Sequence, residues 1–421
     1  MVKILNAFDV ASWRLCSGCG ACYFACPEDN IILKDVVDDG IRPFLKNRGV
    51  CLNCSACLKV CPSLQQLSRD LERFFPKIAS ENQKKWGYFK VLFEGYAADE
   101  QLRFAGSSGG VVTALAAYCL LELGFEGVLH VSSDGICPYR NVTTFSQSVD
   151  ELFENTGSRY SPASPCDSLK KIRDADNPCV FIGKPCDVSA VRQAAAVDEK
   201  LKKNLGLVIG IFCAGTPSTL GTLELLKKYD LDPKRLSILR YRGHGWPGEM
   251  TAVEKVKSRS FKLSYQESWS FLQSYRPIRC HLCPDGTSEL ADISCGDAWY
   301  RDSINDDPGM SLILARTESG YAIFNGAGKQ GYIKFSPVEE KALEDSQFNL
   351  LNKKRAIWGR LLAMKLIGIP VPRYVGYFLF ENWQKLPLEE KIRSFAGTIK
   401  RILARGYYKP KKLVISKSLK S

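Results

Sequence analysis

The segments Cys16-Ser-Gly-Cys-Gly-Ala-Cys-Tyr-Phe-Ala-Cys-Pro27 and Cys51-Leu-Asn-Cys-Ser-Ala-Cys-Leu-Lys-Val-Cys-Pro62 repeat one pattern of four cysteines and a proline. Three closely spaced thiolates can reach three irons of one [4Fe–4S] cube, and the fourth thiolate, turned away before the proline, reaches the neighbouring cube. The pattern therefore predicts two [4Fe–4S] clusters in a small domain of the bacterial-ferredoxin type over residues 1–80.

We expect the cluster ligands to cross between the two segments, because the fourth cysteine of each segment serves the other cube. Small residues between the cysteines leave room for backbone amides to approach the inorganic sulfurs. Two zinc knuckles are the alternative, but zinc sites use two separated pairs of ligands rather than four in one run. The resulting assignment is Cys16, Cys19, Cys22 and Cys61 for one cluster and Cys51, Cys54, Cys57 and Cys26 for the other.

The composition is that of a globular protein with more than one domain. Of 421 residues, 45% are hydrophobic and 24% are charged, so disorder is not expected. The sequence shows neither a run of about 18 apolar residues nor a signal-peptide pattern, and 17 cysteines in a chain of this length favour metal ligation in a reducing compartment. We expect a cytoplasmic protein.

Anionic clusters offset part of the formal charge of +13, so this charge does not indicate nucleic-acid binding.

Strands and helices alternate over residues 88–345, which predicts a mixed α/β domain with a largely parallel sheet. The stretch 63–85 is polar and compatible with a helix, and residues 346–421 are expected to form a helical, basic C-terminal extension. The overall class is α+β or α/β. Expected strands are 91–93, 127–131, 178–182, 207–212, 236–241, 252–256 and 260–263, with helices over 110–123, 188–204 and 217–229 and a strand–helix pair over 311–323.

Four further cysteines follow strand ends or lie in a loop rich in Pro and Asp. Cys186 and Cys213 each follow an expected strand, and the ends of parallel strands meet at one edge of a sheet. Cys280 and Cys283 could close over that edge, which predicts a third [4Fe–4S] cluster on these four thiolates. A structural zinc on the same residues and unligated thiols remain alternatives. Free buried thiols are expected at Cys119, Cys137, Cys166, Cys179 and Cys295.

The segment Gly106-Ser-Ser-Gly-Gly-Val-Val-Thr-Ala-Leu115 is a turn of small residues that opens an expected helix. Free amides at a helix start suit a phosphate or the edge of a flavin. A glycine-rich turn without a ligand is the plain alternative.

Seven motifs in this order resemble the coenzyme F420 hydrogenase/dehydrogenase beta-subunit family. The resemblance covers roughly residues 90–340, with the two-cluster domain in its usual place before it. The motifs are Ser107-Ser-Gly-Gly110, Gly157-Ser-Arg-Tyr160, Gly183-Lys-Pro-Cys186, Phe212-Cys213, Arg242-Gly-His-Gly-Trp-Pro-Gly248, Cys280-His-Leu-Cys283 and Glu289-Leu-Ala-Asp-Ile-Ser-Cys-Gly-Asp-Ala-Trp299.

The resemblance implies a flavoprotein with FAD beside a [4Fe–4S] cluster, an oxidoreductase that passes electrons between clusters and a small-molecule substrate. It supports the third ligand set, and it implies flavin contacts from Ser107, Ser108, Gly109, Gly110 and Thr113. Family members act on coenzyme F420, reduce pigments with ferredoxin electrons, or accompany polysaccharide biosynthesis. The regular cysteine spacing here disfavours the pigment reductases.

Charged side chains in these motifs supply further candidates. His244 could transfer a proton near neutral pH, although a histidine that fixes its own turn is the plainer interpretation. Arg159, Lys184 and Arg242 could hold an anionic substrate or the FAD pyrophosphate, or be structural.

The stretch 361–383 is apolar and aromatic, and a basic tail follows it over 391–421. An apolar stretch followed by a basic tail can cap the core or contact an anionic membrane at its cytoplasmic face.

Expected partners are a redox protein or ferredoxin, with a homo-oligomer as a further option. A noncatalytic subunit that relays electrons to a partner enzyme is the competing function.

Overall fold

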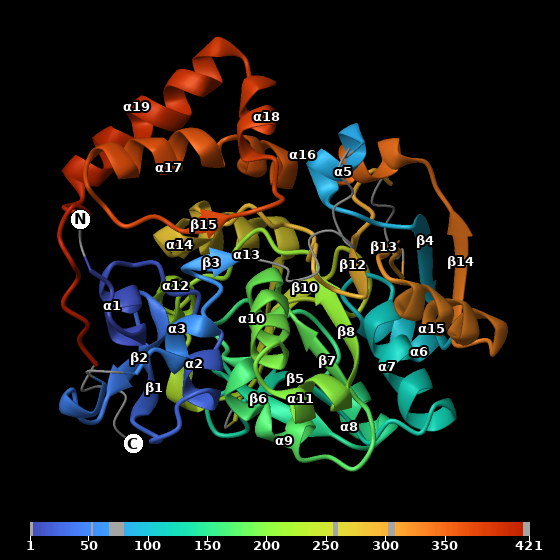
Figure 1. Ribbon diagram of the computed structural model, residues 1–421. Helices are drawn as coiled ribbons and strands as arrows, with labels where there is room; N and C mark the ends of the chain where they lie inside the picture. Colours follow the sequence, from blue (N-terminus) through green and yellow to red (C-terminus); the bar gives the residue numbers. More distant parts are fainter. Residues whose placement is uncertain (1–2, 52–53, 67–79, 256–259, 302–307, 416–421) are drawn as a thin grey trace.

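The computed structural model describes residues 3–51, 54–66, 80–255, 260–301 and 308–415, and its centre is a mixed sheet (Figure 1). The four central strands β12, β8, β7 and β5 are parallel, whereas the four outer pairings are antiparallel. The expectation of a largely parallel sheet is therefore correct for the centre alone. In spatial order the strands are β14 (Ile333–Pro337), β4 (Val91–Ala97), β13 (Ser311–Ala315), β12 (Ile293–Asp297), β8 (Leu205–Ile211), β7 (Cys179–Gly183), β5 (Gly127–Ser133) and β6 (Asn141–Ser146).

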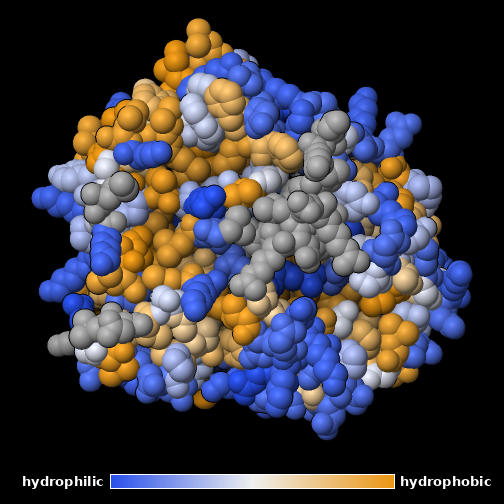
Figure 2. All heavy atoms as spheres, in the orientation of Figure 1, coloured by the Kyte–Doolittle hydropathy of each residue, from blue (hydrophilic) through white to orange (hydrophobic). Residues whose placement is uncertain are grey.

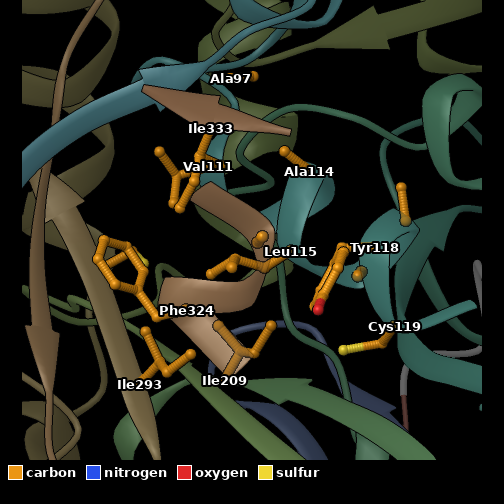
Figure 3. Close-up of a cluster of buried hydrophobic side chains, with 14 of the residues drawn as sticks. Ala97, Val111, Ala114, Leu115, Tyr118, Cys119, Ile209, Ile293, Phe324 and Ile333 are labelled. Atoms are coloured by element: carbon orange, nitrogen blue, oxygen red, sulfur yellow. The ribbon is translucent and has the colours of Figure 1, made fainter. Parts of the chain in front are cut away.

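Helices cover both faces of this sheet because each presents an apolar face to it. Figure 3 shows Leu115 and Tyr118 of α7 (Val111–Glu122) packed with Phe324 of α15 (Glu318–Lys329) against strand residues Ile209 and Ile293. The expected helix over 188–204 is two helices, α10 (Pro185–Ala195) and α11 (Glu199–Asn204). The second begins where the Asp198 side chain accepts a hydrogen bond from the Leu201 amide.

A smaller three-stranded antiparallel sheet lies beside the main one. It consists of β9 (Leu236–Arg240), β10 (Glu249–Glu254) and β11 (Ser260–Ser264), covered by α12 (Thr219–Lys228) and α13 (Tyr265–Leu272). The three strands lie where the sequence predicted them. The remaining helices of the α/β region are α6 (Glu100–Ala105), α8 (Val149–Glu154), α9 (Lys170–Arg173) and α14 (Ile278–His281).

The cysteine-rich segment packs directly against the α/β region. It contains α1 (Ala7–Ser12), α2 (Ala21–Phe24), the hairpin β1 (Ile31–Val36) and β2 (Gly40–Leu45), and α3 (Ala56–Lys59). The Ser164 hydroxyl donates to the Gly18 carbonyl at 2.6 Å, and the Cys166 amide donates to the Cys19 carbonyl at 2.9 Å. These bonds fix one cysteine loop against the larger domain. Of the expected helical stretch 63–85, residues 67–79 lie outside the described residues, and α5 (Glu81–Trp86) forms its end.

The C-terminal extension is helical, as predicted. It contains α16 (Glu340–Arg355), α17 (Ile357–Leu366), α18 (Leu379–Gln384) and α19 (Leu388–Ala404). The short strand β15 (Arg373–Tyr374) pairs with β3 (Gln65–Gln66), which joins the extension to the N-terminal domain. Within the described residues, none of the helices combines the length and the apolar character that a membrane span needs.

A buried ion pair connects the extension to the loop that carries Cys283. The Lys354 ammonium lies 2.8 Å from a Glu289 carboxylate oxygen, with the two side chains 3% and 2% exposed. The same ammonium donates to the Lys85 carbonyl at 3.0 Å. Because neither charge reaches solvent, each depends on the other.

Replacing Lys354 with Ala should destabilise the protein by about 3–5 kcal/mol, because the Glu289 carboxylate is then buried without its counter-ion. The measurement is a lowered Tm by circular dichroism under anaerobic conditions. Lys341→Ala, at an exposed position of the same helix, is the control and should stay within about 0.5 kcal/mol of wild type. Equal Tm values for the two variants would contradict the assignment.

Candidate functional site

The structure brings Cys16, Cys19, Cys22 and Cys61 around one small cavity. Gly18 and Gly20 lie in the loop that lines this cavity. Gly20 has φ of +90°, and a Cβ there would lie 2.8 Å from the Asp167 nitrogen, so only glycine fits at this contact with the larger domain. The four thiols are those that the spacing assigned to one cluster.

The second predicted ligand set is joined by a single asparagine. The Asn30 amide donates to the Cys26 sulfur at 3.2 Å, and its side-chain nitrogen donates to the Cys51 sulfur, also at 3.2 Å. Burial raises the pKa of Cys57, and the neighbouring thiols Cys51, Cys54 and Cys26 raise it further. Cys26 thus lies with the cysteines of the second segment, which is the crossing that the sequence predicted.

A third set of four thiols lines a cavity of about 50 Å³ between the N-terminal domain and the large domain. Cys186 lies in the first turn of α10 and Cys213 follows β8, so the parallel pairing of β7 with β8 brings them to one edge. Cys280 and Cys283 come from α14 and the loop after it, which is held by a hydrogen bond of 2.9 Å from the Cys213 amide to the Gly286 carbonyl.

Burial controls the protonation of these thiols. It raises the pKa of Cys186 and Cys283, and it raises that of Cys213 to about 11, while the Lys353 ammonium lowers the pKa of Cys213 and Cys283. The free thiols of Cys186, Cys213 and Cys283 are therefore protonated near neutral pH, and iron must displace their protons to bind. In the described part of the chain, no three His, Cys, Asp or Glu side chains lie close enough to hold a single metal ion.

Arg279 is a buried cation at the wall of this cavity. Its guanidinium donates to the Tyr374 hydroxyl at 2.7 Å and to the Pro62 carbonyl at 3.5 Å, and its Nε has no partner among the described residues. The side chain therefore reaches from the third set of thiols to the residue that follows Cys61.

A larger cavity of about 320 Å³ adjoins the third set. One wall is the start of α7, where Gly110 (φ +73°) is the N-cap and no side chain caps the helix. The amides of the first helical turn are thus available to an anion. Polar residues of the cavity wall include Asn141, Thr156, Ser158 and Thr216, and aromatic residues include Tyr160, Tyr265, Trp269 and Trp299.

Most of the predicted flavin contacts line this large cavity, namely Ser107, Ser108, Gly110, Thr113, Arg159 and Lys184. Gly109 does not. Its φ is +76°, and a Cβ there would lie 3.1 Å from the Gly309 carbonyl oxygen. A side chain at Gly109 would strain the turn itself rather than only obstruct a ligand.

The two arginines of the cavity wall differ in their partners. Arg242 is 1% exposed, and it donates to both Asp297 oxygens, at 2.6 and 3.0 Å, and to the Ser107 carbonyl at 2.6 Å. Its charge is paired, so its role is to fix the turn. Arg159 donates to the Asn141 side chain and to the carbonyls of Leu239, Pro138 and Arg140, and burial lowers its pKa. Its bonds are to neutral acceptors.

His244 is not among the residues that line either cavity. Its ring stacks on Phe104, with centroids 5.7 Å apart and planes 3° from parallel, and its φ is +59°. Burial and the nearby Arg240 and Lys262 lower its pKa. This placement matches the plainer interpretation of a histidine that fixes its own turn, and we assign no proton transfer to it.

The aromatic wall and Asp297 were not predicted as site residues. The Tyr265 and Trp299 rings stack 5.3 Å apart, and the Arg242 guanidinium lies 4.6 Å from the Tyr265 ring centre. The Trp246 indole also donates to Asp297, at 2.9 Å. The available signal was the order Gly-Asp-Ala-Trp at residues 296–299, which spans the end of β12 at the sheet edge where ligands collect.

The three sites are continuous. Cys16 lines both the first cluster cavity and the third thiol set, and Lys184 and Cys213 line both the third set and the large cavity. The Lys184 ammonium is neutralised by Asp187 at 2.5 Å. The first thiol set and the third thiol set thus lie in a row that leads from the N-terminal domain to the large cavity.

Comparison with known proteins gives three matches along the chain. Residues 92–171 and 177–341 match the N-terminal and C-terminal parts of the family described as coenzyme F420 hydrogenase/dehydrogenase, beta subunit. Residues 15–64 match the 4Fe-4S dicluster domain. The matches support iron–sulfur electron transfer and an oxidoreductase-related role.

Relatives carry the same description. The coenzyme F420 hydrogenase subunit beta of Methanococcus voltae is 25% identical over 68% of this chain and 99% of its own length. The F420-dependent formate dehydrogenase subunit beta of Methanocaldococcus jannaschii is 26% identical over 59% of this chain and 62% of its own. A chain of the F420-reducing [NiFe] hydrogenase complex from Methanosarcina barkeri has a similar fold, with a TM-score of 0.55 at 20% identity over 70% of this chain and 98% of its own.

Replacing Cys26 with Ser should damage the cluster that also uses Cys51, Cys54 and Cys57, because the four thiols lie together. EPR of the reduced variant should match that of Cys54→Ser and differ from that of Cys19→Ser, with the loss of up to roughly four irons per chain. Cys137→Ser, outside all three thiol sets, should keep the wild-type iron content. A Cys26→Ser spectrum that matches Cys19→Ser would refute the crossing.

Proposed function

The chain belongs to the coenzyme F420 hydrogenase/dehydrogenase beta-subunit family, and we propose that it is an iron–sulfur flavoprotein that exchanges electrons between its clusters and a substrate at FAD. The observation that carries the proposal is the shared wall of the two cavities, where Lys184 and Cys213 border both. A group in the large cavity would lie next to the third thiol set.

A third [4Fe–4S] cluster fits the thiol set between the domains. Four thiols surround the cavity, and cations at Arg42, Arg279 and Lys353 also line it. Because a cube with four thiolates is anionic, these cations would offset its charge in a buried place. The proposed ligands are Cys186, Cys213, Cys280 and Cys283.

The chemistry of the large cavity's wall suits FAD. The α7 start offers amides without an obstructing side chain, and Arg159 supplies a buried positive charge whose bonds go to neutral acceptors. A diphosphate needs both features. FAD can exchange single electrons with clusters and two electrons with a substrate. It would therefore connect one-electron transfer between clusters with two-electron reduction or oxidation of the substrate.

The substrate class follows from the aromatic residues of the cavity wall and from the relatives. Tyr265, Trp269 and Trp299 line the cavity, and aromatic side chains suit a planar conjugated molecule. The relatives are named for coenzyme F420, so that deazaflavin is the first candidate to test. This chain's residues would bind and orient the molecule and exclude water from it.

A noncatalytic electron-transfer subunit is the second candidate. The named relatives are subunits of hydrogenases or formate dehydrogenases, so a redox partner protein is expected in either case. The two candidates differ in whether the large cavity binds FAD and a substrate, which makes flavin content the decisive measurement.

Thr113→Trp should abolish FAD binding, because Thr113 lies on α7 at the wall of the large cavity and an indole would fill the space. Iron content should be unchanged, since the thiols lie elsewhere. Leu121→Trp, on the same helix and 61% exposed, should keep both iron and FAD. Flavin and iron are measured on one anaerobic sample. Stoichiometric FAD in Thr113→Trp would place the flavin elsewhere.

Cys213→Ser should remove up to roughly four of the roughly twelve irons expected for three cubes, while the two N-terminal clusters survive. The readout is iron per chain together with EPR of the dithionite-reduced protein. Cys295→Ser is the control, because Cys295 is buried in β12 and outside the thiol sets. A wild-type chain with only eight irons per polypeptide would remove the third cluster from the proposal.

A further inference from the structure

Helix α19 exposes an apolar stripe to solvent. Leu388, Ile392 and Leu403 are 73%, 56% and 58% exposed, and Phe395 and Ile399 between them are half-buried. Their spacing of three or four residues places all five along one side of the helix. Single exposed apolar residues are ordinary, but a continuous stripe over four turns marks a contact surface.

The stripe is not the face that holds the helix on the protein. That face consists of Ser394, Thr398 and Ile402, which are buried. The Trp383 indole donates to the Ser394 hydroxyl at 3.1 Å, and Ile402 packs in a cluster with Leu282 and Met364. The small polar residues anchor α19 to α17 and α18, so its most apolar residues remain available to something else.

Positive charge borders the stripe. Within α19, Lys391, Arg393, Lys400 and Arg401 follow the two acidic residues Glu389 and Glu390. At 100° per residue, Lys391 lies on one side of the stripe and Arg393 and Lys400 lie on the other. Arg393 pairs with Glu389 and Glu390. The first turn of α19 is therefore nearly neutral, and the positive charge rises toward its end.

Helix α19 lies at one end of the molecule, and its buried residue Ile402 packs in one cluster with Leu15 of the N-terminal domain and with Leu282. Figure 1 shows α17, α18 and α19 together at one end of the molecule, beyond the sheet, and Figure 2 shows an apolar area over that end. The family match ends at residue 341, so these helices lie outside it. The stripe thus needs an explanation other than the shared chemistry of the family.

We propose that α19 binds the surface of an anionic membrane, with its apolar stripe in the headgroup region and its basic residues against the phosphates. A helix with one apolar side and flanking Lys and Arg is the pattern of helices that lie in this interface. A second copy of the chain fits less well, because pairing would bring the basic ends of two α19 helices near each other. The remaining alternative is that an acidic protein covers the stripe.

The test is sedimentation of the full chain, with its clusters, together with lipid vesicles. One set of vesicles contains phosphatidylcholine alone, and the other also contains about 30% phosphatidylglycerol, which gives it an anionic surface. We expect binding to the anionic vesicles, at least about tenfold weaker binding to the neutral ones, and loss of binding at high salt. Absent or equal binding to the two vesicles would overturn the proposal.

Two variants separate the contributions. Ile392→Gln with Leu403→Gln removes apolar area without changing charge, and Lys400→Gln with Arg401→Gln removes charge; each pair should weaken binding by about tenfold or more. Ile136→Gln, at an 82% exposed apolar residue far along the chain, is the matched control and should bind as wild type. Unchanged binding in both pairs would overturn the proposal.

Light scattering in the absence of lipid tests the alternatives. We expect no change of oligomeric state between wild type and Ile392→Gln with Leu403→Gln. A dimer that dissociates in this variant would assign the stripe to a second copy. If vesicle binding disappears when a co-purified acidic protein is removed, the apolar stripe is instead the contact surface for that protein. Either result overturns the membrane proposal and leaves the iron and flavin measurements unaffected.

Discussion

The parallel pairing of β7 with β8 is the constraint on which the candidate redox site depends. Ile182 lies opposite Ile209 and Gly183 opposite Gly210, so both strands end at the same edge and deliver Lys184 and Cys213 to one place. An antiparallel pairing would send the two ends to opposite edges of the sheet. The loop with Cys280 and Cys283 then needs only to fold over that edge, where the Cys213 amide bonds to the Gly286 carbonyl.

Much of this could be predicted because the signals were local. Cysteine spacing within a dozen residues determines which thiols can share a cube, and apolar runs between helices identified β7 and β8. Strands β6, β12 and β14 were missed because their sequences, Asn-Val-Thr-Thr-Phe-Ser, Ile-Ser-Cys-Gly-Asp and Ile-Lys-Phe-Ser-Pro, mix polar residues, Gly or Pro with few apolar ones. Strands β12 and β14 also pair with β8 and β4, which lie far away in the sequence, whereas β6 pairs with the preceding strand β5.

The roles of individual charged residues were harder to predict for the same reason. Arg242 was a candidate for anion binding until its contacts with Asp297 and Ser107, 55 and 135 residues away, showed its charge to be paired. Gly109 was a candidate contact, but its carbonyl and Cα face Ala97 and the 309–310 segment instead of the cavity. Sequence gives the residue type, while the partner that decides its chemistry comes from the complete fold.

The two ends of the chain are packed against each other, and this has a consequence for synthesis. The Lys411 amide donates to the Ser12 carbonyl, the Arg14 side chain donates to the Lys409 carbonyl, and Leu413 packs with Ala11 and Val36. Figure 1 shows the last described residues running down beside the N-terminal domain. Ser12 and Arg14 precede their partners Lys411 and Lys409 by almost 400 residues, so these contacts form late in synthesis. During that interval the stretch around Cys16 lacks part of its final packing, because Cys16 lies beside the cluster that contains Leu413.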